Sequence, residues 1–486
     1  MNDPNEPSDL DGESVAATGD SITGELEPAP EVSPPERKEK PDQGFFSRLK
    51  SVINYGSYSV YLVTSWILGI FGIIMQNYLT LFLRDFILLY VPGIELVYVT
   101  IGAVILAFMG IELVARFFAG YIGDNYNRKW LSVLTMFVSG IAMLIFAFSF
   151  NLLGLIVGVL IMAGGSLFGA GSTSYIYEQM EPENSGLAMG IFQTSSGFGL
   201  IGLGLVTWLL AMGVPFVQTI QVVFFVGAMC YMAATVIRVL FLAEPRPIVR
   251  KEQETKKSLE FVKQNFNALK LLYIILPIFT AILILDALSD GFYRFSTNLY
   301  LNEALGFSIG EISIMLIVVL AFSIPLSVTV GSFFDQRGSR RAILIVYSVM
   351  PITLILLILA PIFPYWLPVT IAGPLIASFP ITEPLMSTAF LAVAMKNIND
   401  ILWWTLILTY LRKAIPRSET AKMLSIFWIV VSISFLITPI PSGIIYTLFG
   451  AIPLLVMALV INFVILGILI FANVEPRDIP EEYRYL

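Results

Sequence analysis

The sequence predicts an all-α membrane protein with twelve transmembrane helices, divided into two halves of six. Three observations predict this fold: the composition, the long uncharged windows, and a charged turn that occurs once in each half. Of the 486 residues, 57% are hydrophobic and 13% are charged, and the mean hydropathy is +0.82. An ordinary soluble domain carries about 25% charged residues. Uncharged stretches such as 131–163 are long enough to cross about 30 Å of hydrocarbon as helices.

The apolar runs predict the individual spans, because each run is bounded by a short polar segment. In the first half, domain 44–242, the predicted spans are 55–83, 95–120, 130–150, 152–178, 185–211 and 215–242. In the second half, domain 268–473, they are 268–300, 309–334, 341–362, 385–411, 419–446 and 450–473. Between the halves, the charged stretch 243–267 is interpreted as a cytoplasmic linker.

The first 43 residues differ from the rest of the chain. Residues 1–36 contain ten Asp or Glu and no Lys or Arg, which is typical of a disordered acidic tail. A signal peptide would need a basic start and an apolar core, so we expect this tail to be retained in the cytoplasm. Residues 474–486 are interpreted as a second cytoplasmic tail.

Basic residues predict the orientation, because Lys and Arg in short loops are held on the cytoplasmic side. With an even number of spans in each half, the basic loops fall on one side of the membrane together with the linker. These loops contain Arg128, Lys129, Arg337, Arg340, Arg341, Arg412, Lys413 and Arg417. The sequence therefore predicts cytoplasmic termini and a cell-membrane location.

One charged turn has the same design in both halves. Its residues are Gly120, Asp124, Arg128 and Lys129 in the first half, and Gly331, Asp335, Arg340 and Arg341 in the second. A glycine at a helix end permits close helix contact, and an Asp can accept hydrogen bonds from the amides of a helix N-terminus. We interpret each turn as a latch between helices. A plain basic loop with Asp as a turn former explains one copy more easily than two.

A second repeat locates an insertion in the second half. The segment PENSGLAMG (182–190) resembles PRSETAKML (416–424), but this pair is spaced more widely than the two turns. Extra residues must therefore lie between 341 and 416. The proline-rich segment 364–385 is the candidate, and we interpret it as a re-entrant or interfacial segment on the outer side.

With its repeated turn and its six-plus-six spans, the sequence resembles the major facilitator superfamily over about residues 50–475. The family signature has Gly, three residues, Asp, and a turn that ends in basic residues; here Asn127 replaces the second glycine. The resemblance implies two six-helix bundles around a central substrate cavity, with transport by alternating access. It also implies that the Asp124 and Asp335 turns form the cytoplasmic gate.

Charged residues inside the spans are few, and each is costly at the bilayer centre. Six of them form pairs spaced by four residues, so the members of each pair share a helix face and can neutralise one another. The pairs are Glu112 and Arg116, Asp290 and Arg294, and Lys396 and Asp400. A purely structural role is open for all three pairs. Glu112, Asp290 and Asp400 are also candidates for proton coupling.

Asp286 differs from these because no basic residue lies three or four positions away. Burial of a lone carboxyl in an apolar span favours its protonated form, so Asp286 can take up and release a proton. It is the leading candidate for proton coupling or for binding a cationic substrate. The alternative is a protonated or water-facing acid without a role.

The resemblance implies that spans 1, 4, 7 and 10 build the cavity. Polar and aromatic residues that could line it are Gln76, Asn77, Arg294, Asn298, Asn397, Trp403 and Trp404. Adjacent tryptophans point in different directions on a helix, so at most one of the last two faces the cavity. The other would anchor the helix at the membrane interface.

The sequence favours a transporter over other classes. One cysteine and no histidine argue against a metal cluster or cofactor, and no nucleotide-binding loop or nucleophilic triad supports an enzyme or a nucleic-acid partner. We expect a monomer that moves a small organic solute, coupled to protons and favouring efflux because the cavity candidates are aromatic and acidic. A flippase for lipids or lipid-linked glycans, and a non-transporting sensor, remain alternatives.

Overall fold

The computed structural model describes residues 50, 52–55, 57–169, 175, 188, 191–192, 194–243, 269–270, 272–334, 339–414 and 420–472. Three predicted segments therefore lie outside the described residues: the acidic tail 1–43, the linker beyond Ala243 and the tail 474–486.

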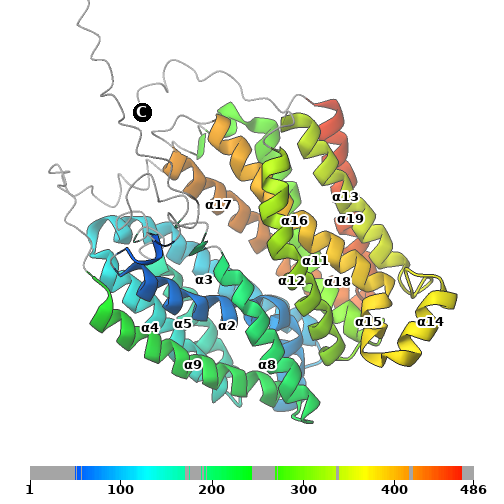
Figure 1. Ribbon diagram of the computed structural model, residues 1–486, viewed down its shortest axis with the longest axis horizontal. Helices are drawn as coiled ribbons and strands as arrows, with labels where there is room; N and C mark the ends of the chain where they lie inside the picture. Colours follow the sequence, from blue (N-terminus) through cyan, green and yellow to red (C-terminus); the bar gives the residue numbers. More distant parts are fainter. Residues whose placement is uncertain are drawn as a thin grey trace, which may run out of the picture. The chain divides into compact units, whose positions relative to one another are not determined.

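The described part of the first half is helical (Figure 1). Its α-helices are α2 (Tyr58–Tyr90), α3 (Val97–Asn125), α4 (Arg128–Ala147), α5 (Leu152–Gly165), α8 (Gly199–Ala211) and α9 (Phe216–Phe241). Two short 3-10 helices, η1 (Ser166–Phe168) and η2 (Thr194–Phe198), follow α5 and precede α8.

The second half is also helical in its described residues. The long helices are α11 (Pro277–Glu303), α12 (Ile309–Phe334), α13 (Ser339–Leu359), α16 (Thr388–Ala414), α17 (Thr420–Ile437), α18 (Pro439–Phe449) and α19 (Ile452–Phe471). The shorter elements α14 (Val369–Ser378), η3 (Pro380–Thr382) and α15 (Glu383–Met386) lie between α13 and α16.

Six stretches among the described residues are long and apolar enough to cross a membrane. They are Tyr58–Tyr90, Val97–Ala119, Arg128–Ala147, Phe216–Phe241, Ile426–Phe449 and Ile452–Phe471. Shorter apolar helices cover parts of the other predicted spans, for example Leu152–Phe168 and Ile343–Leu359. α11 and α16 are 27 residues each, but they carry several charged side chains. The twelve-helix arrangement in two bundles stays a prediction.

Prolines account for two differences between predicted spans and observed helices. The span predicted at 268–300 is helical at 269–270 and 272–275, is interrupted at Leu276 and continues as α11 from Pro277. Proline lacks an N–H group and suits the first turn of a new helix. The span predicted at 419–446 is divided at Thr438 into α17 and α18, and Pro439 begins the second helix.

Helices pack both within and between the halves of the sequence. In the first half, α4 packs against α5 and α9, and in the second half α11 packs against α17 and α19. Contacts between the halves include α3 with α18, α8 with α12, and α2 with α11. α3 and α18 approach closely because Gly102 faces the backbone of Pro439 and Gly443 faces the backbone of Tyr98, so a Cβ atom at either glycine would clash.

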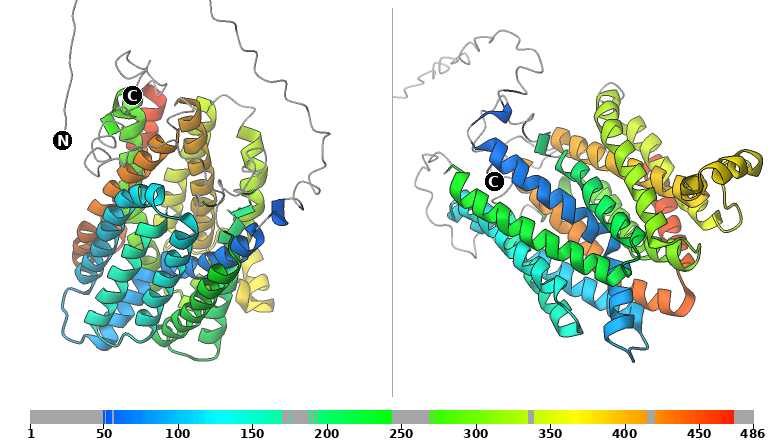
Figure 2. Two further views of the ribbon diagram at one scale, coloured as in Figure 1. Left: turned by 90° about the vertical axis from the view of Figure 1, so that its left-hand side faces the viewer. Right: turned by 60° about the horizontal axis from the view of Figure 1, so that its bottom comes forward.

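The predicted insertion 364–385 forms a short helical excursion whose base is closed by hydrogen bonds. Thr388 N donates to Pro364 O at 2.9 Å, and Trp366 N donates to Met386 O at 3.2 Å. Its ten-residue helix α14 is too short to cross the hydrocarbon, which needs about 20 residues. The right-hand view in Figure 2 agrees with Figure 1 that α14 projects from the neighbouring helices. Its place relative to the membrane stays a prediction.

A buried arginine joins three helices of the first half. Arg238 on α9 is fully buried, and its guanidinium donates hydrogen bonds to Thr64 Oγ1 (2.8 Å) and Ser65 Oγ (2.8 Å) on α2 and to Ser132 Oγ (2.6 Å) on α4. It also lies 4.7 Å from the centre of the Tyr61 ring. Hydroxyl groups and an aromatic face therefore hold this cation.

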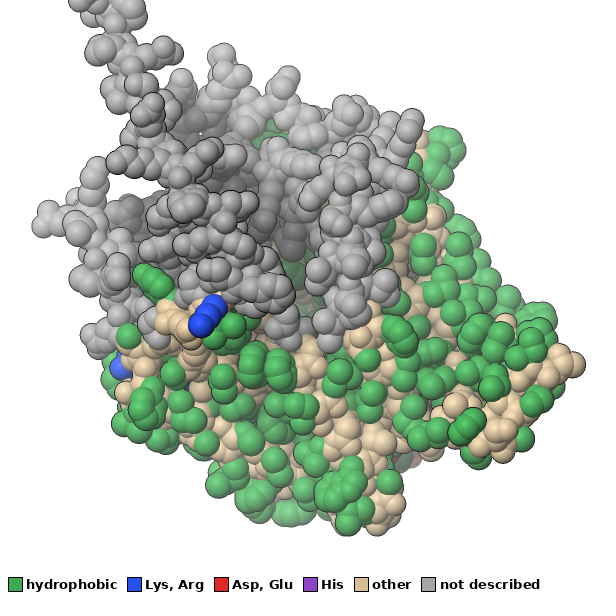
Figure 3. All heavy atoms as spheres, in the orientation of Figure 1, with side chains coloured by type: hydrophobic (Ala, Val, Ile, Leu, Met, Phe, Trp, Pro, Cys, Tyr) green, Lys and Arg blue, Asp and Glu red, His purple; other side chains and the backbone are tan. Residues whose placement is uncertain are grey.

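The face shown in Figure 3 is covered mainly by hydrophobic side chains where the structure is described. Exposed aromatic and aliphatic residues recur on several helices, for example Trp208, Leu240 and Phe471. Such a surface is expected where helices contact lipid tails and not water.

Candidate functional site

Among the described residues, the largest group of buried charges lies between α11 and α16. Lys396 on α16 is 2% exposed, and its Nζ lies 2.7 Å from Asp290 Oδ1 and 2.5 Å from Asp400 Oδ1. Asp290 is on α11, so this ammonium joins the two helices. A shared cation is what allows two carboxylates to remain close together in a dry interior.

A second cation completes this group. Arg294 Nη2 lies 3.5 Å from Asp290 Oδ2, and the guanidinium carbon lies 5.3 Å from the centre of the Phe435 ring on α17. The Arg294 side chain is 49% exposed, whereas Lys396 lies 4.9 Å from the centre of the buried Tyr293 ring. The group thus has one enclosed cation and one cation whose side chain is about half exposed.

Asp286 lies one helical turn before Asp290 and is 6% exposed. Its Oδ2 accepts a hydrogen bond from Trp403 Nε1 at 2.8 Å, and its Oδ1 lies 3.2 Å from the Tyr347 hydroxyl. Among the described residues it forms no salt bridge. The hydrogen-bond partners of this carboxyl are therefore neutral, in contrast to those of Asp290 and Asp400, although these charged residues lie near it.

The Tyr347 hydroxyl can serve Asp286 in both protonation states. It also lies 2.6 Å from Asn462 Oδ1, and a hydroxyl has one proton to donate. If the hydroxyl donates its hydrogen bond to Asn462, its oxygen can accept a hydrogen bond from neutral Asp286. If Asp286 is ionised, the hydroxyl can donate to it instead. The carboxyl can thus change its charge without losing a partner.

The pairs predicted from spacing are all present as contacts. Besides Asp290–Arg294 and Lys396–Asp400, Arg116 Nη2 lies 2.6 Å from Glu112 Oε1 on α3. Glu112 also accepts a longer hydrogen bond, of 3.4 Å, from Ser166 Oγ. Its contacts are with α3 and η1, so Glu112 does not join the α11–α16 group.

The residues predicted to line the cavity lie in different surroundings and do not form one group. Trp403 is buried against Asp286, whereas Trp404 stacks on Trp428 with ring centres 5.1 Å apart. Asn298 on α11 reaches the first half, because its Nδ2 donates to Asn77 O on α2 at 2.6 Å.

The remaining amides have local surroundings. The Asn77 and Asn397 side chains donate to Ile73 O and Val393 O of their own helices, each at 2.9 Å. Gln76 is exposed.

The charged turns are described only in part. Arg128 and Lys129 begin α4, and Asn127 caps this helix by accepting a hydrogen bond from Lys129 N at 2.9 Å. Asn127 thus has a capping role where the family signature has glycine. The rest of the two turns lies outside what the structure describes. Asp335 is not described at all, and only the backbone is described at Gly120, Asp124, Gly331, Arg340 and Arg341. The latch between helices therefore stays a prediction.

A further polar group, which the sequence did not predict, joins the two halves at the C-terminal ends of α2 and α11. Glu303 lies 2.7 Å from Arg84 Nη1 and accepts hydrogen bonds from the Tyr98 hydroxyl (2.9 Å) and the Tyr446 hydroxyl (2.6 Å). Arg84 also pairs with Asp85 at 2.7 Å. Four helices, α2, α3, α11 and α18, therefore meet at one carboxylate.

Comparisons with known proteins agree with this helical architecture. The family model of the Major Facilitator Superfamily matches residues 52–400. No protein with a curated description matches the chain in sequence.

Solved structures resemble the chain in fold. The D-xylose-proton symporter has a TM-score of 0.64 at 12% identity, covering 86% of this chain and 97% of its own. The inward-open xylose transporter XylE from E. coli has a TM-score of 0.61 at 13% identity, covering 87% and 96%. The nucleoside transporter NupG has a TM-score of 0.59 at 15% identity, covering 85% and 98%. Because the family model covers more than half of the sequence, the chain belongs to the major facilitator superfamily.

Proposed function

We propose that this protein is a proton-coupled secondary transporter that moves a small organic solute by alternating access. The observation that carries the proposal is the buried group formed by Asp286, Asp290, Lys396 and Asp400, with Arg294 at its edge. Buried ionisable residues inside membrane helices are costly, and they are kept where they bind or relay ions and substrates.

The charge count within this group assigns the proton to Asp286. Asp290 and Asp400 balance the two cations Lys396 and Arg294, so an ionised Asp286 would be a third, unbalanced carboxylate. Its partners Trp403 and Tyr347 are neutral. Taking an uncompensated charge out of water costs several kcal/mol, and protonation avoids this cost.

The exposed Arg294 and the nearby aromatic residues suit a solute with both polar and aromatic parts. Similar solved transporters are named for xylose or nucleosides, and another is in complex with a conjugated peptide; all of these are polar organic molecules. Once Asp286 has released its proton, the group carries one negative charge in excess, which favours a cationic solute, and the aromatic residues favour an aromatic one. For such a solute we propose export from the cytoplasm in exchange for protons.

Alternating access requires one end of the protein to open while the other is closed. The Arg84–Glu303 group joins both halves at the C-terminal ends of α2 and α11, and we propose that it closes the outer end. Asp124 lies at the other end of α3 from Tyr98, which contacts Glu303, and Asp335 follows α12 in the sequence. We propose that both turns close the cytoplasmic end in the alternate conformation.

Purified protein in liposomes that contain a pH-sensitive dye tests this function. Sugars, nucleosides, peptides and aromatic cations are added one at a time, and a transported solute should change the internal pH. In Asp286→Asn, exchange of labelled for unlabelled solute should persist, because the amide mimics the protonated carboxyl, while proton movement is lost. Glu112→Gln is the matched control and should keep both activities. Unchanged proton movement in Asp286→Asn would refute the proposed proton carrier.

A further inference from the structure

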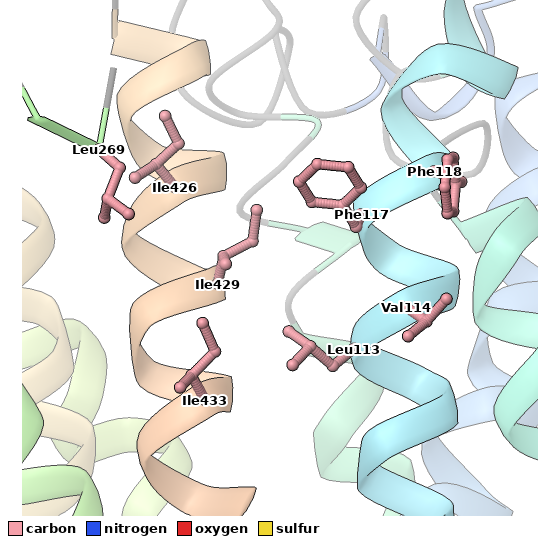
Figure 4. Close-up of a pocket in the computed structure, with 8 residues that line it drawn as sticks. All are labelled: Leu113, Val114, Phe117, Phe118, Leu269, Ile426, Ile429 and Ile433. Carbon is pink, nitrogen blue, oxygen red and sulfur yellow. The ribbon is translucent and has the colours of Figure 1, made fainter. Parts of the chain in front are cut away.

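An apolar cleft lies between α3 and α17 and is separate from the charged group. Figure 4 shows Leu113 and Phe117 of α3 pointing toward Ile429 and Ile433 of α17. The cleft has a volume of about 330 Å³, which is within the range of small-ligand sites. Its full lining is Leu113, Val114, Phe117, Phe118, Leu269, Ile426, Ile429 and Ile433.

The cleft is a wedge because α3 lies close to the end of α17 and to the start of α18 at Pro439. At Gly110 an added Cβ atom would lie 3.6 Å from Leu436 Cδ1, which is ordinary contact distance, and at Gly102 it would clash with Pro439. Farther along α3, from Leu113 to Phe118, the space to α17 is open (Figure 4). The wedge therefore widens toward the end of α3 that carries the charged turn.

The lining of the wedge is continuous with the outer apolar surface of the same helices. Val114, Phe118 and Ile433 line it, and they are 57%, 42% and 44% exposed. Both helices belong to stretches that are apolar enough to cross the membrane. In a bilayer these exposed side chains contact lipid tails, so the wedge opens onto hydrocarbon.

We propose that this wedge binds one acyl chain of a membrane phospholipid. Water is a poor occupant, because an ordered water needs two to four polar partners and the lining residues are all aliphatic or aromatic. An empty wedge would leave its walls without contacts on one side, and a hydrocarbon chain restores those contacts. The bilayer supplies such chains at the mouth of the wedge.

The bound chain has a consequence for the conformational change. It holds α3 and α17 apart next to the charged turn, so it must leave when these helices close. Phospholipid occupancy thus favours the splayed arrangement, and this inference does not depend on the proposed role of Asp286.

Photo-crosslinking in vesicles tests the site. The full-length protein is reconstituted in phosphatidylcholine containing a trace of phosphatidylcholine with a diazirine at the end of one acyl chain. After illumination, modified residues are located by peptide mass spectrometry. We expect label to concentrate on 113–118 and 426–433, and Ile429→Trp, which fills the wedge, to lose this label.

Val236→Trp is the matched control, because Val236 is 56% exposed on α9 and distant in sequence from both walls. It should keep the label in the wedge. If Ile429→Trp does not fold, Leu113→Phe fills the wedge from the opposite wall and should also lose the label. If the label is spread evenly over all exposed helices and is unchanged in these variants, it comes from the surrounding bilayer lipid and not from a bound chain. That result would overturn the proposal.

Discussion

Two buried cations, one in each half of the chain, are held in opposite ways. Arg238 in the first half is surrounded by hydroxyl groups of Thr64, Ser65 and Ser132. Lys396 in the second half is surrounded by the carboxylates of Asp290 and Asp400. Hydroxyl groups stay uncharged over the physiological pH range, whereas carboxylates can take up and release protons.

The difference separates a structural site from a site suited to function. Removing the first cation leaves neutral groups. Removing the second leaves Asp290 with only the more distant Arg294 and leaves the half-buried Asp400 without a cation. We therefore expect the first half to serve as a fixed scaffold and the second half to respond to protons. The following predictions test this contrast, beginning with the largest effect.

Lys396→Met should have the largest effect on stability. The substitution leaves Asp290 and Asp400 facing each other without their shared cation, and breaking a buried ion pair in this way costs about 3–5 kcal/mol. Thermal unfolding of the purified protein in detergent measures this loss. The double variant Lys396→Met/Asp290→Asn should recover part of the stability, since one unpaired charge is removed. A double variant that is less stable than Lys396→Met would contradict the ion-pair account.

Arg238→Met should cost less, about 1–2 kcal/mol, although Arg238 is fully buried. Its hydroxyl partners already have bonds within their own helix, because Thr64 Oγ1 donates to Val60 O and Ser65 Oγ donates to Tyr61 O. The same unfolding experiment compares this variant with Lys396→Met. If Arg238→Met were the more damaging of the two, the distinction between the two sites would be wrong.

Ser132→Ala should have the smallest effect of the three, about 0.5–1 kcal/mol. The Arg238 Nη1 atom loses its bond to Ser132 Oγ but keeps the backbone oxygen of the same residue at 3.0 Å. Unfolding and the pH dependence of transport should both be measured, and the pH dependence should match the wild type. An altered pH dependence would show that the first half also takes part in proton coupling.

The sequence was sufficient for features that depend on neighbours along one helix. Apolar runs located the long helices, and spacing by four located Glu112–Arg116, Asp290–Arg294 and Lys396–Asp400, because such pairs share a helix face whatever the tertiary fold. Pro439 lies inside the predicted span 419–446, but the apolar run across it favoured one continuous helix.

Contacts between helices could not be predicted from a single sequence. Lys396 and Asp290 are 106 residues apart, and Arg84 and Glu303 are 219 apart, so only packing shows that they meet. The partners of Asp286 were missed for the same reason. Asn462 could have indicated a buried polar contact, since it is the one Asn in the most hydrophobic of the described spans and a buried amide needs a hydrogen-bond partner.

The central claim is that Asp286 holds a proton while Asp290 and Asp400 are ionised. Infrared spectroscopy of the carboxyl groups tests this claim most directly. In wild-type protein at neutral pH, the account predicts an absorption band from a protonated carboxyl in an apolar setting. This band should vanish in Asp286→Asn and persist in Asp400→Asn. A band that persists in Asp286→Asn, or is lost only in Asp400→Asn, would contradict the assignment of the proton to Asp286.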